Sequence, residues 1–230
     1  MGTTRGEALR ARITDWGIRR TCYWYVMTFL ERVFGLHLHY VYVSGLRSRH
    51  PVPAADGYVH RQVPLSELLP YAGGDGELGQ ELSREFLRQA IDRGDLCVAS
   101  YFGDELVGFD FSSSQRVPAT SQLDHIIPRG FLYSYKSWTH PDHRGRRLGI
   151  YRIEIQWDQG LHFIYAIETH NYPSVLRPYR PPAERRIRMG YAGWIEFRGR
   201  HIPFVSRRAR WIGFGLVPTG QADGRRYLEG

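Results

Sequence analysis

The chain has 230 residues and a formal net charge of +8, from 31 basic and 23 acidic residues. A hydrophobic fraction of 42%, with 14% aromatic residues, can fill a core and excludes a wholly disordered chain. Two cysteines, Cys22 and Cys97, exclude a disulfide scaffold and a four-cysteine zinc site. Such sparse cysteine use fits a reducing cytoplasm, which is the predicted location.

The positive charge is not spread evenly along the chain. Residues 1–50 carry eight arginines and three acids, residues 51–143 seven basic residues and thirteen acids, and residues 144–210 fourteen arginines and five acids. The resulting net charges are +5, −6 and +9. This asymmetry favours an anionic partner such as a phosphate, a nucleic acid or a membrane surface, and solvated surface arginines are the alternative.

The N-terminal segment lacks an apolar core followed by a small-residue cleavage site, so no signal peptide is expected. Residues 15–34 are predicted to form an amphipathic helix whose aromatic and arginine side chains would suit the inner face of a membrane. Packing on the domain or on a second subunit, as in a homodimer, is the alternative. We divide the chain into an N-terminal helix–strand extension and linker, residues 1–57, and a domain, residues 58–230.

The remaining elements alternate between strands and a few helices. Strands are predicted at residues 36–43, 58–63, 96–102, 106–111, 131–139, 163–168, 191–197, 201–205 and 211–217. Helices are predicted from residue 64, over residues 77–93 and over residues 150–160. Loops are predicted at residues 44–57, 73–76 and 112–130, with a Pro- and Arg-rich segment at residues 177–190. The pattern indicates a mixed α/β chain with one sheet.

The most informative motif follows the strand at residues 131–139. Thr139-His140-Pro141 ends that strand, and Arg144-Gly145-Arg146-Arg147-Leu148-Gly149 leads into the next helix. The two glycines allow backbone amides to point into a concave nest, and a helix N-terminus adds partial positive charge. Together with the arginines, this arrangement suits a diphosphate.

These residues resemble the acetyl-CoA loop of the GNAT acyltransferase superfamily, which reads Arg/Gln-x-x-Gly-x-Gly/Ala after a strand. Arg147 replaces the middle glycine of the family pattern here. The order of the strands and of Met189-Gly190-Tyr191 agrees with the family over about residues 58–217. The resemblance implies an α/β (α+β) fold with a mixed, mostly antiparallel central sheet flanked by helices.

The resemblance also implies an N-acyltransferase that moves an acyl group, in the first instance acetyl, from coenzyme A to a primary amine. A long-chain donor on acyl-CoA or acyl carrier protein (acyl-ACP) is an alternative, and no metal is expected, since His37 and His39 share a strand face without a third ligand. The donor-binding residues implied by the resemblance are Ser137, Trp138, Thr139, Arg144, Gly145, Arg146, Arg147, Leu148, Gly149, Asn171 and Ser174.

An ammonium acceptor must lose a proton before it attacks the thioester, so the chemistry needs a base. Glu168, near the end of the predicted strand at residues 163–168, is the first candidate, and a surface carboxylate is its alternative reading. His140 is a weaker candidate, and His170 and Asp110 stay open. By the same resemblance Tyr179 is the candidate acid for the leaving thiolate.

A non-enzymatic role is the competing hypothesis. The basic half of the chain could bind nucleic acid, with Trp194, Phe197, Phe204 and Trp211 as stacking surfaces. No recognised nucleic-acid-binding module appears, so nucleic acid is not the expected partner. The expected partners are an amine-bearing acceptor, which the sequence does not identify, and, with a long-chain donor, acyl carrier protein.

Overall fold

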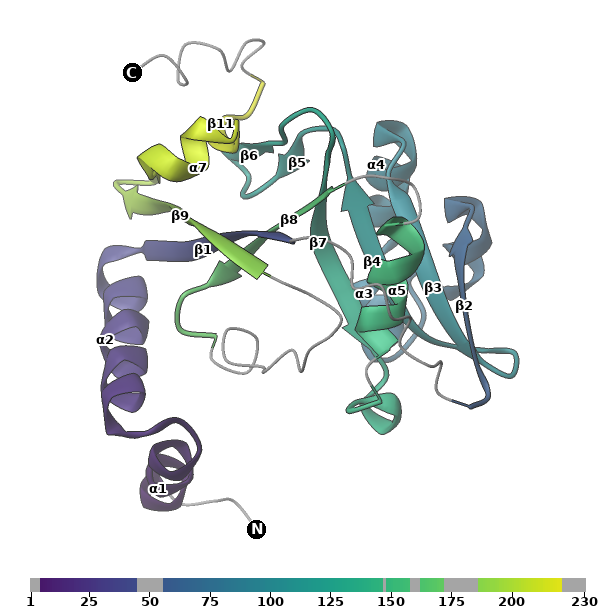
Figure 1. Cartoon of the computed structure of the whole chain (residues 1–230), viewed down its shortest axis with the longest axis horizontal. Coiled ribbons are helices and arrows are strands. Elements are labelled where there is room, and N and C mark those ends of the chain that lie inside the picture. Colours follow the sequence, from purple (N-terminus) through teal and green to yellow (C-terminus); the bar gives the residue numbers. More distant parts are fainter. Residues whose placement is uncertain (1–4, 45–55, 147, 158–161, 172–185, 221–230) are drawn as a thin grey trace.

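A computed structural model describes residues 5–44, 56–146, 148–157, 162–171 and 186–220. Its main feature is an eight-stranded sheet with the order β10-β9-β1-β8-β7-β4-β3-β2 (Figure 1). These strands are β1 (Leu36–Ser44), β2 (Tyr58–Val63), β3 (Leu96–Phe102), β4 (Glu105–Ser113), β7 (Phe131–Thr139), β8 (His162–Glu168), β9 (Arg186–Phe197) and β10 (Arg200–Val205). All neighbours are antiparallel except β7 and β8, which are parallel. The predicted mixed, mostly antiparallel sheet flanked by helices is therefore confirmed.

Helices cover both faces of the β2–β3–β4–β7 half of the sheet. The 3₁₀ helix η1 (Leu65–Tyr71), α3 (Glu77–Glu81) and α4 (Arg84–Arg93) lie on one face, where Leu68, Leu82 and Leu87 pack on Cys97 and Phe109. The other face carries α5 (Leu148–Trp157), which contacts β2, β3 and β4. Alternate residues of β3 and β4 thus enter two different layers.

A second, three-stranded sheet was not predicted. It has the order β11-β6-β5, from β5 (Val117–Pro118), β6 (Leu123–Ile126) and β11 (Gly215–Pro218), and it packs with α7 (Arg207–Trp211) over β1, β8 and β9. The prediction of a loop over residues 112–130 was therefore wrong. These strands are so short and polar that only alternate burial, as at Leu123 and His125, marks β6. The strand predicted at 211–217 is present as β11 but begins only at Gly215, because Trp211 ends α7.

Two predicted helices are each broken into two. Residues 15–34 span the end of α1 (Arg5–Trp16) and the whole of α2 (Ile18–Phe34), with Gly17 between them at φ 80°. The predicted helix at 77–93 is interrupted after α3, and the Ser83 hydroxyl accepts a 3.2 Å hydrogen bond from the amide of Phe86 to start α4. A Ser N-cap three residues before a helical amide is a standard start signal that outweighs the continuous apolar spacing.

The N-terminal segment contributes an interior strand to the main sheet. β1 pairs with β8 through His39 and Glu168, and with β9 through residues 36–44, and its Val41 is fully buried. β9 begins at Arg186, inside the Pro- and Arg-rich segment at residues 177–190. None of the helices in the described ranges is long and apolar enough to span a bilayer.

Candidate functional site

The two parallel strands at the centre of the sheet separate soon after they begin. β7 and β8 pair only at Phe131–His162, Leu132–Phe163 and Tyr133–Ile164, and Figure 1 shows them running apart beyond these pairs. Within the described part of the chain, the edge of β7 that faces β8 is therefore unpaired from Ser134 onwards. An unpaired strand edge offers amide and carbonyl groups to an extended ligand.

β7 also carries an extra residue relative to β4. Phe111 pairs with Lys136 and Ser112 with Ser134, so Tyr135 is inserted opposite β4. Such a bulge turns neighbouring backbone groups out of the regular ladder. The bulge lies within the stretch where β7 has lost β8 as a neighbour, which exposes its backbone amides to the same opening.

The predicted phosphate loop follows β7 as a short turn. The 3₁₀ helix η2 (Pro141–His143) is followed by Gly145 at φ +84°, a left-handed conformation with open space where a Cβ would lie. Leu148 then begins α5 and packs with Tyr58 and Val107, so its side chain is core and only its backbone could contact a ligand. Arg147 lies outside the described residues.

Arginine side chains of the loop have protein partners. Arg144 Nε donates to the Thr139 carbonyl at 3.0 Å, and its Nη2 donates to Glu77 Oε1 at 2.7 Å. Trp138 Nε1 donates to the same Glu77 oxygen at 3.0 Å. Arg146 lies over the Tyr58 ring, with its guanidinium carbon 5.8 Å from the ring centre. Both arginines are exposed, so they remain accessible to an anion.

A fully buried arginine lies beneath β7. Arg152 of α5 donates through Nη1 to Ser100 at 3.1 Å, and through Nη2 to Thr139 at 3.1 Å and Ser137 at 3.4 Å. Its side chain would collide with a Cβ on Gly108, 2.5 Å from Arg152 Nη1, so the glycine makes room for it. Ser137 and Thr139 were predicted to bind the donor, but their hydroxyls accept hydrogen bonds from Arg152 inside the protein.

Asp110 is buried close to this arginine. Desolvation by burial raises the pKa of Asp110, while Arg152 and hydrogen bonds from Ser134 and Ser137 oppose the shift. The Ser134 hydroxyl donates to Asp110 Oδ1 at 2.8 Å. Burial also lowers the pKa of Arg152, and Asp110 counteracts that shift. Because both groups are sealed from solvent, they hold β4, β7 and α5 together, and Asp110 has no access to a substrate.

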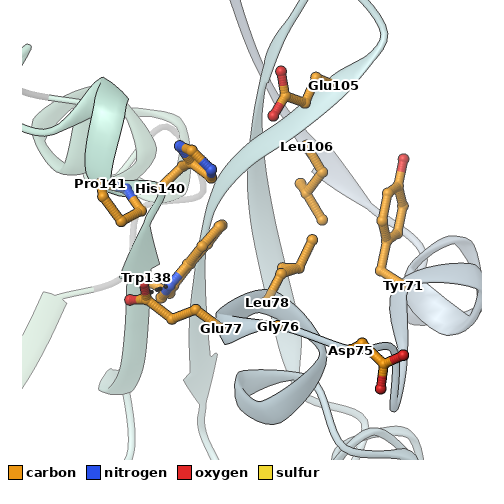
Figure 2. A pocket seen from close by; sticks show the side chains of 10 residues that line it. All are labelled: Tyr71, Asp75, Gly76, Glu77, Leu78, Glu105, Leu106, Trp138, His140 and Pro141. Atoms are coloured by element: carbon orange, nitrogen blue, oxygen red, sulfur yellow. Dashed lines mark hydrogen bonds between the residues drawn. The ribbon is translucent and has the colours of Figure 1, made fainter.

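A cavity of about 360 Å³ lies on the opposite face of β7, beside the start of the loop (Figure 2). Figure 2 shows His140 and Pro141 on one side of it and Tyr71 and Asp75 on the other, with Trp138, Glu77 and Leu78 between them. The lining residues are Tyr71, Asp75, Gly76, Glu77, Leu78, Glu105, Leu106, Trp138, His140 and Pro141. Three carboxylates and two large aromatic rings make this a cavity suited to a cation.

The predicted base lies at the far end of β8. Glu168 Oε2 is 4.0 Å from His170 Nε2, and its carboxylate is about half exposed. His170 Nε2 is also 3.5 Å from Glu31 Oε2, on α2. Glu168 pairs with His39 across the sheet, and burial, with His37 and His170 nearby, lowers the pKa of His39 to about 4. Sequence reasoning missed Glu31, because no local signal joins α2 to the end of β8.

The structure brings some predicted residues together and leaves others apart. Trp138, His140 and Arg144 surround Glu77 and the cavity, and the Asn171 amide donates to the Glu168 carbonyl at 3.0 Å. No contact among the described residues joins Glu168 to the loop at residues 144–149. Ser174 and Tyr179 lie outside the described residues. Within the described ranges, no group of three or more His, Cys, Asp or Glu side chains is placed to hold a metal ion.

Comparisons with known proteins add a likeness of fold. No family model matches the chain, and no curated protein sequence matches it significantly. A tandem GNAT protein from the clavulanic acid biosynthesis pathway is 16% identical, with a TM-score of 0.41, and the match covers 86% of this chain and 59% of that one. A GCN5-related N-acetyltransferase from Sphaerobacter thermophilus is 10% identical, with a TM-score of 0.35, over 84% of this chain and 53% of that one.

A third similar structure is a putative GNAT-family acetyltransferase from Xanthomonas campestris pv. campestris. It is 16% identical, with a TM-score of 0.30, and the match covers 54% of this chain and 86% of that one. This chain thus spans little more than half the length of the first two structures.

Proposed function

We propose that the protein is an N-acyltransferase that moves an acetyl group from coenzyme A to a primary amine by direct attack in a ternary complex. The observation that carries this proposal is the open edge of β7, which ends at an Arg- and Gly-containing loop and a helix N-terminus. Acetyl-CoA is an extended thioester that carries two amides and a diphosphate, and these groups match the unpaired strand edge and the loop that follows it. The amides would pair with β7, and the diphosphate would meet the loop.

Arg144 and Arg146 are the charged groups that we assign to the diphosphate. Both are exposed, and charge-assisted hydrogen bonds to phosphate are among the stronger polar contacts. The turn at Gly145 supplies backbone amides without a side chain in the way. To reach a phosphate, Arg144 would exchange its bond to Glu77, an exposed pair whose loss costs little.

We assign the cavity between α3 and β7 to the acceptor. Asp75, Glu77 and Glu105 would attract an ammonium group, and Trp138 and Tyr71 would face it with ring surfaces. The cavity begins at His140 and Pro141, next to the loop assigned to the donor. Donor and acceptor sites on adjoining surfaces are what direct transfer requires.

Glu168 is the base that we propose for the reaction. By alternation along β8 it lies on the same face of the sheet as Ile164 and Ala166, and Tyr135 connects that layer with the layer containing Trp138. The ammonium loses a proton to Glu168, directly or through water. The amine nitrogen then bonds to the thioester carbon, the C–S bond breaks, and the nitrogen gives up a second proton, which balances the one taken up by the leaving thiolate.

The test is the release of free thiol from acetyl-CoA, long-chain acyl-CoA or acyl-ACP in the presence of a panel of primary amines. We expect turnover with acetyl-CoA and a cationic amine. Glu168→Gln should retain donor binding and slow turnover at neutral pH by about 10²–10⁴-fold, the usual contribution of a general base.

Glu196→Gln, at an exposed position on β9, is the matched control and should turn over like the wild type. Unchanged turnover in Glu168→Gln would exclude this residue as the base. Absence of thiol release with every donor and amine would contradict the proposed function.

A further inference from the structure

The outer face of α2 is apolar. Its exposed apolar residues recur at the spacing of a single helical face. They are Ile18, Cys22, Tyr25, Val26, Phe29 and Val33, named here the α2 stripe. Phe29 is 57% exposed and Val33 56%, and no charged residue interrupts the α2 stripe. A row of exposed apolar side chains that runs from Ile18 to Val33 on one helix indicates a surface that is covered by a partner.

The contacts of α2 with the main sheet lie on its other side, and at one edge of the α2 stripe Arg12 of α1 donates to the Tyr25 hydroxyl at 3.4 Å. Thr21 and Met27 are buried, and the Tyr23 hydroxyl donates to Thr169 at 2.8 Å. Glu31 lies beside His37 and His170 at 3.5 Å each. Figure 1 shows α1 and α2 standing at one end of the molecule, at its periphery. These contacts orient the α2 stripe outward.

An arginine flanks each side of the α2 stripe. At 100° per residue, Arg19 lies about 20° beyond Val26 on one side, and Arg32 lies about 20° beyond Tyr25 on the other. Both arginines are exposed, and neither forms an ion pair with any residue in the described ranges. The apolar surface is therefore bordered by positive charge along both edges.

This charge pattern favours an anionic surface over a second copy of the chain. Glu31 is the only acidic residue in α2, and it lies on the packed side beside His170. A second α2 packed on the α2 stripe would therefore offer no carboxylate to Arg19 or Arg32, whereas a surface of phosphate groups would offer a negative charge to both.

We propose that the α2 stripe binds the interfacial region of an anionic lipid bilayer, with Arg19 and Arg32 at the level of the lipid phosphates. The apolar side chains enter the boundary between headgroups and acyl chains, and α2 lies parallel to the surface. Each arginine close to an anionic surface strengthens binding roughly fivefold. This surface is separate from the donor and acceptor sites, and the proposal does not depend on the proposed function.

The test is co-flotation of the full chain with vesicles of phosphatidylcholine alone or with 30% phosphatidylglycerol. We expect binding to the anionic vesicles and at least tenfold less to the neutral ones, with binding reduced by salt. The double variant Val26→Asp/Phe29→Asp should lose at least tenfold of the binding. The matched control is Ile91→Asp, an exposed apolar position on α4, and it should bind like the wild type.

Two further variants make the result independent of any folding defect. Arg19→Ala/Arg32→Ala should lose about tenfold or more on anionic vesicles, whereas Arg84→Ala/Arg208→Ala should not. Phe29→Trp should show a blue shift of its emission when anionic vesicles are added. Equal binding to neutral vesicles, no effect of Val26→Asp/Phe29→Asp, or no emission shift would overturn the proposal. A concentration-dependent dimer abolished by Val26→Asp would assign the surface to a second copy and overturn it as well.

Discussion

Arg144 Nη2 donates to Glu77 Oε1 at 2.7 Å, and this bond joins the loop after β7 to the first turn of α3. The same carboxylate oxygen accepts from Trp138 Nε1, so one acidic group is bound to the loop and also lines the cavity. The site that we assign to the donor and the site that we assign to the acceptor therefore share Glu77. Binding of the donor should therefore change the affinity for the acceptor, and binding of the acceptor should change the affinity for the donor.

Replacing Glu77 should make donor binding tighter. In Glu77→Gln the charge that holds Arg144 is removed, so the guanidinium reaches a phosphate at lower cost. Because an exposed ion pair contributes up to about 1 kcal/mol, the dissociation constant for coenzyme A should fall by up to about fivefold. Calorimetric titration measures this. The control is Glu105→Gln, which removes another carboxylate of the cavity that does not contact Arg144. It should leave the dissociation constant for coenzyme A within twofold of the wild-type value. Weaker binding of coenzyme A by Glu77→Gln would contradict the role of Glu77 in both sites.

A methyl group at position 108 should destabilise the fold. Gly108→Ala places a Cβ 2.5 Å from Arg152 Nη1 and 3.0 Å from the Trp138 carbonyl oxygen, so the buried guanidinium must move. Overpacking of this kind costs about 1–3 kcal/mol of the free energy of unfolding, measured by urea denaturation. Gly74→Ala, with nothing within 4 Å of its new Cβ, should change that free energy by less than about 0.5 kcal/mol. A Gly108→Ala protein as stable as the wild type would show that Arg152 is not held tightly.

Acid should weaken the fold through three histidines. Burial lowers the pKa of His39 and of His60 to about 4 and that of His125 to about 3, with smaller contributions from neighbouring histidines at His39 and His125 and from Arg152 at His60. Below the ordinary histidine pKa of about 6.5, the unfolded chain binds protons that the folded chain does not. Stability from this source is therefore full above about pH 6.5 and falls as the pH drops towards 4, by up to about 1.4 kcal/mol per pH unit for each group.

The free energy of unfolding measured between pH 7 and pH 4 tests this dependence. His39→Gln should lessen the slope, because one of the three histidines no longer titrates differently in the folded and unfolded states. His162→Gln, at an exposed position, serves as the comparison and should retain the wild-type slope. An unchanged slope in His39→Gln would mean that His39 takes up its proton in the folded state as well.

The strand, turn and helix of residues 131–149 could be predicted because each is specified by residues close to it in the sequence. A strand rich in aromatic residues, a proline, an Arg-Gly turn and a helix follow one another, and the structure contains them in that order as β7, η2 and α5. The loop residues Arg144, Gly145 and Arg146 are exposed at the end of β7, as the pattern requires. Strand propensity and turn chemistry act over a few residues, which is the range that a sequence pattern reports.

The contacts that shape the rest of the site are not local. The burial of Arg152 on α5 depends on Gly108 on β4. Only the packing of α5 on the sheet reveals that this glycine makes room for the guanidinium. Glu31 and His170 are far apart in the sequence and meet because β1 inserts beside β8. The short strands β5 and β6 depend on β11 for their partners, so polar composition alone predicted a loop.

The most direct test of the central claim is calorimetric titration of the full chain with acetyl-CoA. The open edge of β7 and the loop at residues 144–149 predict saturable one-to-one binding. That binding should weaken at least tenfold in Arg144→Ala/Arg146→Ala, because charge-assisted contacts to phosphate are lost. Arg207→Ala/Arg208→Ala, at exposed positions on α7, should bind like the wild type. No heat of binding with the wild type, or equal binding by both double variants, would contradict a thioester site at this loop.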